Sequence, residues 1–260
     1  MTPPRLHSTA DIVAAVKGLH EITGPQNCVI LGTMALLPVL GDKDTWLRQS
    51  IDIDLVTAKG FVSPRQSNLF QRKLGLASEF EMEHGFYVHI VPPKYISDLP
   101  HGWKERAIQV PVGESAAYCL SPLDVAFNKL LAGRPKDFAY LEEMVKQGIV
   151  TMDSLREFAQ LAAPGEKREQ VLKNMDALAL RIQAPSIMED ARQQYASKQI
   201  SLEEASGKCL DCFSVSKQNE HKAFMDVFQF LRNPSVTATE VKEQILAAEN
   251  QPHIQRGIRI

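Results

Sequence analysis

Residues 50–56, with the sequence SIDIDLV, are the stretch that decides the fold of this chain. Polar and apolar side chains alternate in it, which is the period of a β-strand. Because successive side chains of a strand point to opposite faces, Asp52 and Asp54 would share one face, with their Cα atoms about 6–7 Å apart. The apolar side chains between them would point into a core: Ile51, Ile53 and Leu55. An edge strand with its polar face in water shows the same pattern, so both interpretations stay open at this point.

Two carboxylates on one face of a strand can also hold a divalent cation. Mg²⁺ is a hard ion that takes oxygen ligands, and it usually shares them with the phosphates of a nucleotide. We therefore expect Asp52 and Asp54 to be metal ligands, for Mg²⁺ or alternatively Mn²⁺.

The composition is that of an ordinary globular protein. The chain has 260 residues, of which 44% are hydrophobic and 23% are charged, and its formal net charge is −2. This balance gives no general positive field for nucleic acid, so any such contact would be local. Four scattered cysteines do not suggest a disulfide scaffold, and no apolar run approaches the ~20 residues of a membrane span. We expect a cytoplasmic protein with no membrane partner.

The first 120 residues mix strand and helix patterns. Residues 28–31, CVIL, predict a buried strand that ends at Gly32 and Thr33 and passes into a helix. Residues 79–83 alternate strictly and predict a hairpin with residues 86–91. Further strands are expected over residues 106–110 and 115–120, and helices over residues 8–21 and from about Pro64 to Leu74.

From Ser121 onward the pattern is helical. Ser121 and Pro122 predict the start of a helix, and the helical pattern continues as four helices to residue 182. Pro185 then predicts a boundary after the fourth helix. The fold class is therefore predicted as α+β, with a small mixed β-sheet and flanking helices followed by an all-helical C-terminal part. We divide the chain into an α/β core (1–120), a helical part that completes the cleft (121–183) and a helical extension of unknown role (184–260).

The turn at Gly32 and Thr33 favours phosphate binding. A glycine lets the backbone approach a phosphate closely, and the N-terminus of a helix suits an anion. Phosphoryl and nucleotidyl transfer need this arrangement beside metal-binding carboxylates.

Residues 129–137, KLLAGRPKD, gather three cations and one acid where two helices meet. Lys129, Arg134 and Lys136 could bind phosphate. Equally, Asp137 could cap the second helix while the cations are solvated. Both interpretations stay open.

Taken in order, Gly32-Thr33, residues 48–54 (RQSIDID) and residues 129–137 resemble the DNA polymerase beta-like nucleotidyltransferase superfamily. More narrowly, they are similar to the minimal bacterial nucleotidyltransferases, which include abortive-infection toxins of toxin–antitoxin pairs. Residues 99–106, LPHGWKER, also resemble that group. The resemblance covers about residues 26–150. It implies the polymerase beta-like fold and transfer of a nucleoside monophosphate from an NTP to an acceptor hydroxyl on an RNA end, a protein or a small molecule.

The resemblance also implies roles for individual residues. Asp52 and Asp54 would hold Mg²⁺, and Asp137 would orient the nucleotide or the acceptor. The nucleotide would be held by a further set: Gly32, Thr33, Ser50, Lys129, Arg134 and Lys136. NTP is the implied substrate, and an antitoxin is an implied partner.

The chain departs from the pattern of the superfamily in three places. The gap from Gly32 to Asp52 is longer than is common, which suggests an extended loop around Trp46. Thr33 stands where glycine or serine is usual. The neighbouring strand offers His89 where a third carboxylate is often found, and histidine is a poor Mg²⁺ ligand. Glu81 or Glu83 could substitute from the other arm of the expected hairpin. The alternative function is therefore a catalytically degenerate fold that acts as a protein- or nucleic-acid-binding module.

Overall fold

The computed structural model describes residues 5–57, 64–162, 164–213 and 215–249. The chain forms two compact units. The first contains Met1–Leu131 and Val145–Arg168, and the second contains Ala132–Met144 and Glu169–Ile260. The predicted α+β class is confirmed, because a small mixed sheet with flanking helices is followed by a helical C-terminal part.

The first unit is built on a five-stranded sheet in the order β3-β2-β1-β5-β4. β1 is antiparallel to β2 and parallel to β5, β2 is parallel to β3, and β4 and β5 form an antiparallel pair. The bounds of the strands are β1 (Cys28–Ile30), β2 (Asp52–Thr57), β3 (Tyr87–Ile90), β4 (Ile108–Val112) and β5 (Ser115–Cys119). The strand that carries the two aspartates therefore lies inside the sheet, between β1 and β3.

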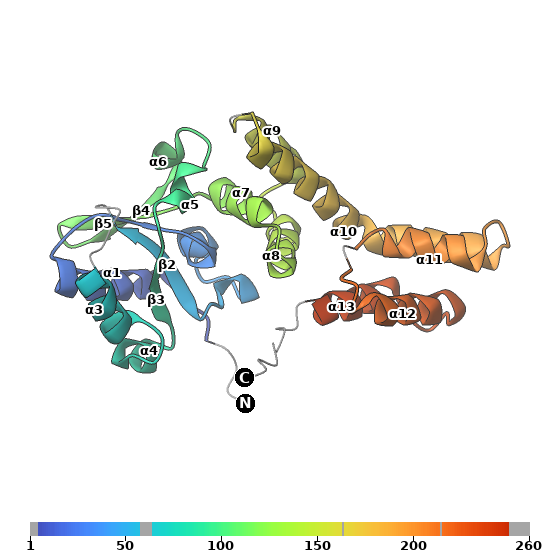
Figure 1. Cartoon of the computed structure of the whole chain (residues 1–260), viewed down its shortest axis with the longest axis horizontal. Coiled ribbons are helices and arrows are strands. Elements are labelled where there is room, and N and C mark those ends of the chain that lie inside the picture. The colour runs from blue at the N-terminus through green and yellow to red at the C-terminus, as the bar shows by residue number, and fades with distance from the viewer. Residues whose placement is uncertain (1–4, 58–63, 163, 214, 250–260) are drawn as a thin grey trace, which may run out of the picture. The chain divides into compact units, whose positions relative to one another are not determined.

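Helices α1 (Thr9–Thr23), α3 (Pro64–Leu74) and α4 (Glu79–His84) gather beside the sheet (Figure 1). α1 contacts α3, β4 and β5, while α3 contacts α4 and β3. Ile53 and Leu55 of β2 are fully buried, and each contributes about 1.5–3 kcal/mol by leaving water. The other helices of this unit are η1 (Thr33–Leu36), α2 (Leu37–Leu40), η2 (Trp46–Arg48), α5 (Lys94–Ser97), α6 (Trp103–Arg106), α7 (Pro122–Ala132) and α9 (Met152–Gln160).

Two predictions about the sheet are wrong. Ile51 does not point into the core, because β2 begins only at Asp52 and the Ile51 side chain is 72% exposed. Residues 79–83 do not form a hairpin arm, because they belong to α4. The Ser78 hydroxyl accepts a hydrogen bond from the Glu81 amide at the start of α4, and Gly85 ends the helix in the left-handed conformation. These start and stop signals outweigh an alternation of only five residues.

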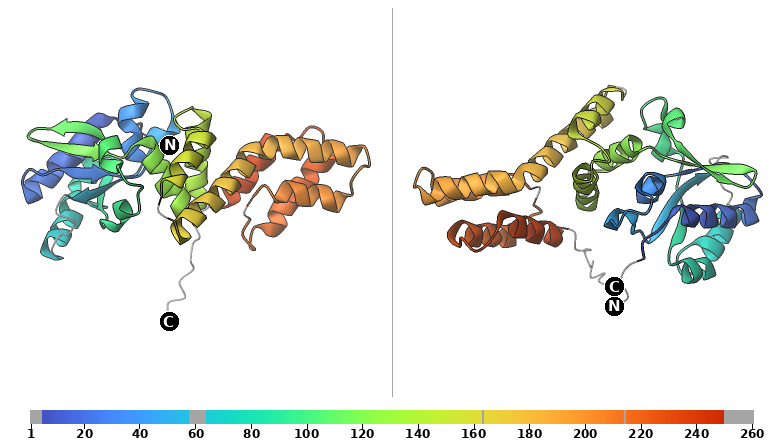
Figure 2. Two further views of the ribbon diagram at one scale, coloured as in Figure 1. Left: turned by 90° about the horizontal axis from the view of Figure 1, so that it is seen from above. Right: turned by 180° about the vertical axis from the view of Figure 1, so that it is seen from behind.

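The second unit is helical. It is formed mainly by α8 (Pro135–Lys146), α10 (Glu166–Ala196), α11 (Leu202–Leu210), α12 (Glu220–Arg232) and α13 (Ala238–Glu249). Figure 2 shows α11, α12 and α13 close together in both views, and α12 contacts both of the others. Their buried side chains share one core with the C-terminal part of α10. This core includes Ala184, Met188, Cys209, Val227, Phe230, Val241 and Ile245.

An ion-pair cluster joins three helices of this unit. Glu142 of α8 bonds to the Arg181 guanidinium of α10 at 2.8 Å and to the Lys242 ammonium of α13 at 2.5 Å. The Arg181 guanidinium also lies over the Phe138 ring, 4.9 Å from its centroid. Lys242 of α13 therefore bonds to residues of α8 and α10 that lie more than sixty positions earlier in the chain.

The predicted helix end before Pro185 is wrong, because α10 runs continuously from Glu166 to Ala196 with this proline inside it. A proline in a helix removes one backbone hydrogen bond and kinks the axis without having to end the helix. The predicted division at residues 183 and 184 thus falls within α10. Among the described helices, none is long and apolar enough to cross a membrane.

Candidate functional site

The two aspartates of β2 form a cluster with a histidine of β3. Asp52, Asp54 and His89 each offer a ligand atom, and these atoms all lie within 4.8 Å of one another. Nδ1 of His89 lies 2.9 Å from Oδ1 of Asp54. The side chains of His89 and Asp54 are 57% and 36% exposed, so a solute can reach them.

The register of the parallel pair β2–β3 creates this cluster. Asp52 lies beside Tyr87 and Asp54 beside His89. The Tyr87 amide donates to the Ile51 carbonyl at 3.1 Å, which fixes this register at the start of the two strands. All four side chains lie on one face, because alternate residues of neighbouring strands point the same way.

Tyr87 is a site residue that sequence reasoning missed. Its phenol is within reach of the Asp52 carboxylate. Partial burial, followed by the negative charges of Asp52 and Asp54, raises the pKa of the Tyr87 phenol. These causes favour the protonated phenol beside Asp52. The sequence does show Tyr87 and His89 at alternate positions of one strand. Only the register of β3 against β2 reveals that they lie beside the two aspartates.

Gly32 lies against the carboxylate of Asp54. The amide of Leu31, the residue before it, donates to the Asp54 carbonyl at 2.9 Å. Gly32 has φ +64°, a conformation that other residues rarely adopt, and a Cβ there would lie 3.2 Å from Oδ2 of Asp54. The next residue, Thr33, is 9% exposed and begins η1. The structure thus brings the predicted Gly32-Thr33 turn to the predicted metal ligands.

Ser50 supports Asp52. Its hydroxyl donates to the Asp52 carbonyl at 2.9 Å and lies 3.3 Å from Oδ1 of Asp52. The Ser50 carbonyl in turn contacts Nε2 of His7 at 2.8 Å. These contacts make Ser50 an orienting residue beside the cluster.

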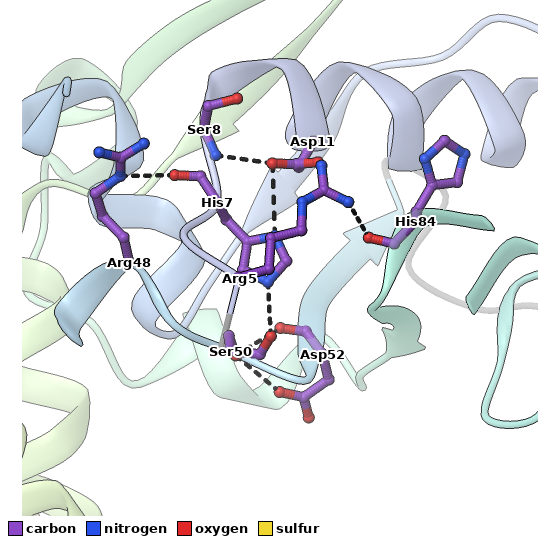
Figure 3. Close-up of polar contacts among 8 residues, drawn as sticks. All are labelled: Arg5, His7, Ser8, Asp11, Arg48, Ser50, Asp52 and His84. Atoms are coloured by element: carbon purple, nitrogen blue, oxygen red, sulfur yellow. Dashed lines mark hydrogen bonds and ion pairs between the residues drawn. The ribbon is translucent and has the colours of Figure 1, made fainter. Parts of the chain in front are cut away.

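The N-terminal segment is bound to the loop before β2. Figure 3 shows the residues involved: Arg5, His7, Ser8, Asp11, Arg48, Ser50, Asp52 and His84. Nε of the buried Arg48 donates to the His7 carbonyl at 2.7 Å, and its Nη1 donates to the Lys43 carbonyl at 3.0 Å. Arg5 pairs with Asp11 of α1 and donates to the His84 carbonyl. Arg48 therefore positions the backbone that leads into β2.

The basic segment at 129–137 is divided between the two units. Lys129 belongs to α7 in the first unit and is 9% exposed. Arg134, Lys136 and Asp137 belong to the second unit. Nε of Arg134 lies 2.6 Å from Oδ2 of Asp137, which is buried at the start of α8, while Lys136 is exposed. The local pair agrees with a structural role for Asp137, and the nucleotide-binding roles of these four residues stay predictions.

Neither Glu81 nor Glu83 belongs to the cluster of Asp52, Asp54 and His89. The Glu81 carboxylate accepts a hydrogen bond from the Ala77 amide before α4, and Glu83 is exposed on that helix. Within the described residues, the third position of the cluster is therefore His89.

No curated protein and no solved structure matches this chain. A sequence model of one protein family matches residues 8–192, which cover the sheet, the aspartate cluster and the basic segment. That length is well over half of the 260 residues. The chain belongs to this family, which is described as nucleotidyltransferases of unknown function (DUF6036).

Proposed function

We propose that the protein is a Mg²⁺-dependent nucleotidyltransferase of the polymerase beta-like kind, which moves a nucleoside monophosphate from an NTP to an acceptor hydroxyl. The observation that carries this proposal is the placement of Asp52 and Asp54 on one face of β2, directly beside the Gly32 turn. Membership of a nucleotidyltransferase family supports it.

The donor set fits a divalent cation. Two carboxylates within 4.8 Å of each other, partly exposed and flanked by Tyr87 and Ser50, are suitable oxygen ligands. When bound, the metal would offset the charge of the phosphates and lower the pKa of the acceptor hydroxyl. Asp52 and Asp54 would hold it, and the Tyr87 phenol would keep Asp52 in the orientation that binding requires.

The remaining residues would hold the nucleotide. The backbone at Gly32 can approach phosphate closely because it carries no side chain, and Thr33 offers a hydroxyl. Lys129, Arg134 and Lys136 would supply positive charge, and Asp137 would orient the nucleotide or the acceptor. These cations provide the charge stabilisation that phosphoryl transfer needs.

A transfer assay tests the proposal. The wild type is incubated with each NTP labelled at the α-phosphate, with Mg²⁺, and with total RNA or protein as acceptor. We expect label on an acceptor, and no label with Asp52→Asn or Asp54→Asn. Equal labelling by the wild type and both variants would show that the two aspartates take no part in the reaction.

The proposal extends to a toxin of a toxin–antitoxin pair, on the resemblance to the minimal bacterial branch. Induced expression of the wild type would then arrest growth, and Asp54→Asn would relieve the arrest at equal protein level. Arrest that persists in the variant would separate toxicity from nucleotidyl transfer.

One observation favours a second candidate function. His89 occupies the position of a third carboxylate and contacts Asp54, which weakens a site built for Mg²⁺. The second candidate is a degenerate fold that binds a protein or nucleic acid. Failure of the wild type to bind any NTP with Mg²⁺ or Mn²⁺ would favour it.

A further inference from the structure

We propose that His89 is itself a metal ligand, and that it shifts the preference of the Asp52–Asp54 site from Mg²⁺ towards Mn²⁺. This inference rests on the proposed function, because it takes the two aspartates as ligands of a divalent cation. It adds the identity of the third protein ligand and the direction in which that ligand shifts the balance between Mg²⁺ and Mn²⁺.

The geometry fits coordination by the imidazole. Nδ1 of His89 and Oδ1 of Asp54 are 2.9 Å apart. Two neighbouring ligands of an octahedral ion, each bound at about 2.1 Å, are separated by about 3.0 Å. A cation can therefore take both atoms with little movement of either residue, and Asp52 completes the group within 4.8 Å.

The strand register presents His89 in the place of a ligand. β3 pairs with β2 so that His89 lies directly beside Asp54 and on the same face. At 57% exposure its side chain is accessible to solvent and free to adjust to an ion. No described acidic residue joins the cluster in its place.

The chemistry of the donors determines the selection. Mg²⁺ strongly favours oxygen ligands, whereas imidazole nitrogen suits the later first-row metals best; Mn²⁺ shares the preference of Mg²⁺ for carboxylates but, as a first-row transition metal, accepts a nitrogen ligand more readily than Mg²⁺ does. With histidine at the third position, the cluster has two carboxylates instead of three. Both effects weaken the attraction for Mg²⁺, and the nitrogen ligand compensates only for a transition metal.

Pulsed electron paramagnetic resonance of bound Mn²⁺ tests the ligand directly, because it detects coupling to a coordinated nitrogen. We expect nitrogen coupling in the wild type and its loss in His89→Ala and His89→Asp. The matched control is His221→Ala, which removes an exposed histidine of the second unit and should keep the coupling. Melting curves establish that each variant is folded, and the exposure of His89 predicts that they are.

Calorimetric titration with Mg²⁺ and Mn²⁺ tests the selection. The ratio of the Mg²⁺ Kd to the Mn²⁺ Kd should fall by about tenfold or more in His89→Asp relative to the wild type. Mn²⁺ binding that needs Asp52 and Asp54 but shows no nitrogen coupling, or an unchanged ratio, would overturn the inference and leave the proposed function standing. If neither metal binds the wild type, with or without NTP, both fall together.

Discussion

At the residue scale, Gly32 combines a backbone conformation that favours glycine with a close approach to the Asp54 carboxylate. Gly32 has φ +64° and ψ −156°, a region that essentially only glycine adopts, so alanine there costs about 1–3 kcal/mol, and its Cβ would lie 3.2 Å from Oδ2 of Asp54. We predict that Gly32→Ala lowers the free energy of unfolding by about that amount and weakens NTP binding. Urea unfolding and calorimetry measure the two effects. Gly113→Ala is the control, because it has φ +62° with nothing near the Cβ, and it should lose stability but not NTP affinity.

The buried thiols make a second prediction at this scale. Burial raises the pKa of Cys28 and of Cys119 from 9.0 to about 12. Between pH 9 and pH 12 the folded chain therefore keeps protons that the unfolded chain releases. The contribution of each thiol to the free energy of unfolding is complete below pH 9 and is lost as the pH rises from 9 towards 12. Each thiol contributes a slope of about 1.4 kcal/mol per pH unit in that range. Urea unfolding at pH 8 and pH 10 measures it.

The control for this prediction is the double variant Cys28→Ala/Cys119→Ala, in which the fall in stability between pH 8 and pH 10 should be smaller. Thiol labelling gives an independent check, because both cysteines should resist a disulfide reagent at pH 8 until urea is added. Rapid labelling of the native protein would contradict their burial.

Sequence reasoning at this scale succeeded where a single strand was enough. The alternation in residues 50–56 placed Asp52 and Asp54 together, and the structure confirms that placement. It failed at Ile51, because the first residue of a strand depends on where the partner strand begins to pair. It missed Tyr87, because the pairing of β2 with β3 is a long-range property that no local pattern contains.

At the element scale, Arg106 fastens the segment before β4 to α7. Its Nη2 and Nε donate to the fully buried Asp124 carboxylate at 2.7 and 3.1 Å. It also donates to the carbonyls of Pro100 and His101. We predict that Arg106→Ala lowers the free energy of unfolding by about 3–5 kcal/mol, because it leaves a buried carboxylate without its counter-charge. Urea unfolding measures the loss.

Lys104→Ala is the matched control for the Arg106 prediction. Lys104 lies on the same short helix, α6, and is exposed, so its removal should change stability by no more than about 0.5 kcal/mol. Similar small losses for both variants would show that the Arg106–Asp124 pair contributes little.

Element types were predicted well where start and stop signals agreed with the period. The strands at 28–31 and 115–120 and the start of the helix after Ser121 were found close to their observed bounds, and the strand expected at 106–110 lies two residues later, at 108–112. The hairpin at 79–91 failed because Ser78 and Gly85, which begin and end α4, were given less weight than the alternation between them. The helix end at Pro185 failed because packing on both sides of this proline keeps α10 continuous.

At the scale of the whole molecule, the core of the first unit contains no residue beyond 168. We therefore predict that a chain truncated after Gln183 keeps its sheet and a cooperative unfolding transition, with a smaller helical signal. Circular dichroism and urea unfolding of the truncated and full chains measure this. The truncation also removes Lys242 and leaves Glu142 with Arg181 alone, so lower overall stability is expected. Loss of the cooperative transition would show that the extension belongs to the core of the first unit.

The fold class was predictable at this scale, because the strand-rich first part and the helical remainder differ in hydrophobic period. The contacts that join distant segments were not. Glu142, Arg181 and Lys242 are ordinary surface residues by sequence, and only the packing of α8, α10 and α13 brings them together. For the same reason, the proposed roles of Arg134, Lys136 and Asp137 rest on resemblance.

Calorimetric titration of the full chain with each NTP, with Mg²⁺ or Mn²⁺ and without metal, tests the central claim most directly. Asp52→Asn and Asp54→Asn are the variants. Both side chains are partly exposed on β2, so the variants should melt like the wild type. The account predicts that at least one NTP binds the wild type only when metal is present, and that either substitution abolishes this binding. NTP binding that is unchanged in both folded variants, or no binding by the wild type with either metal, would contradict the account.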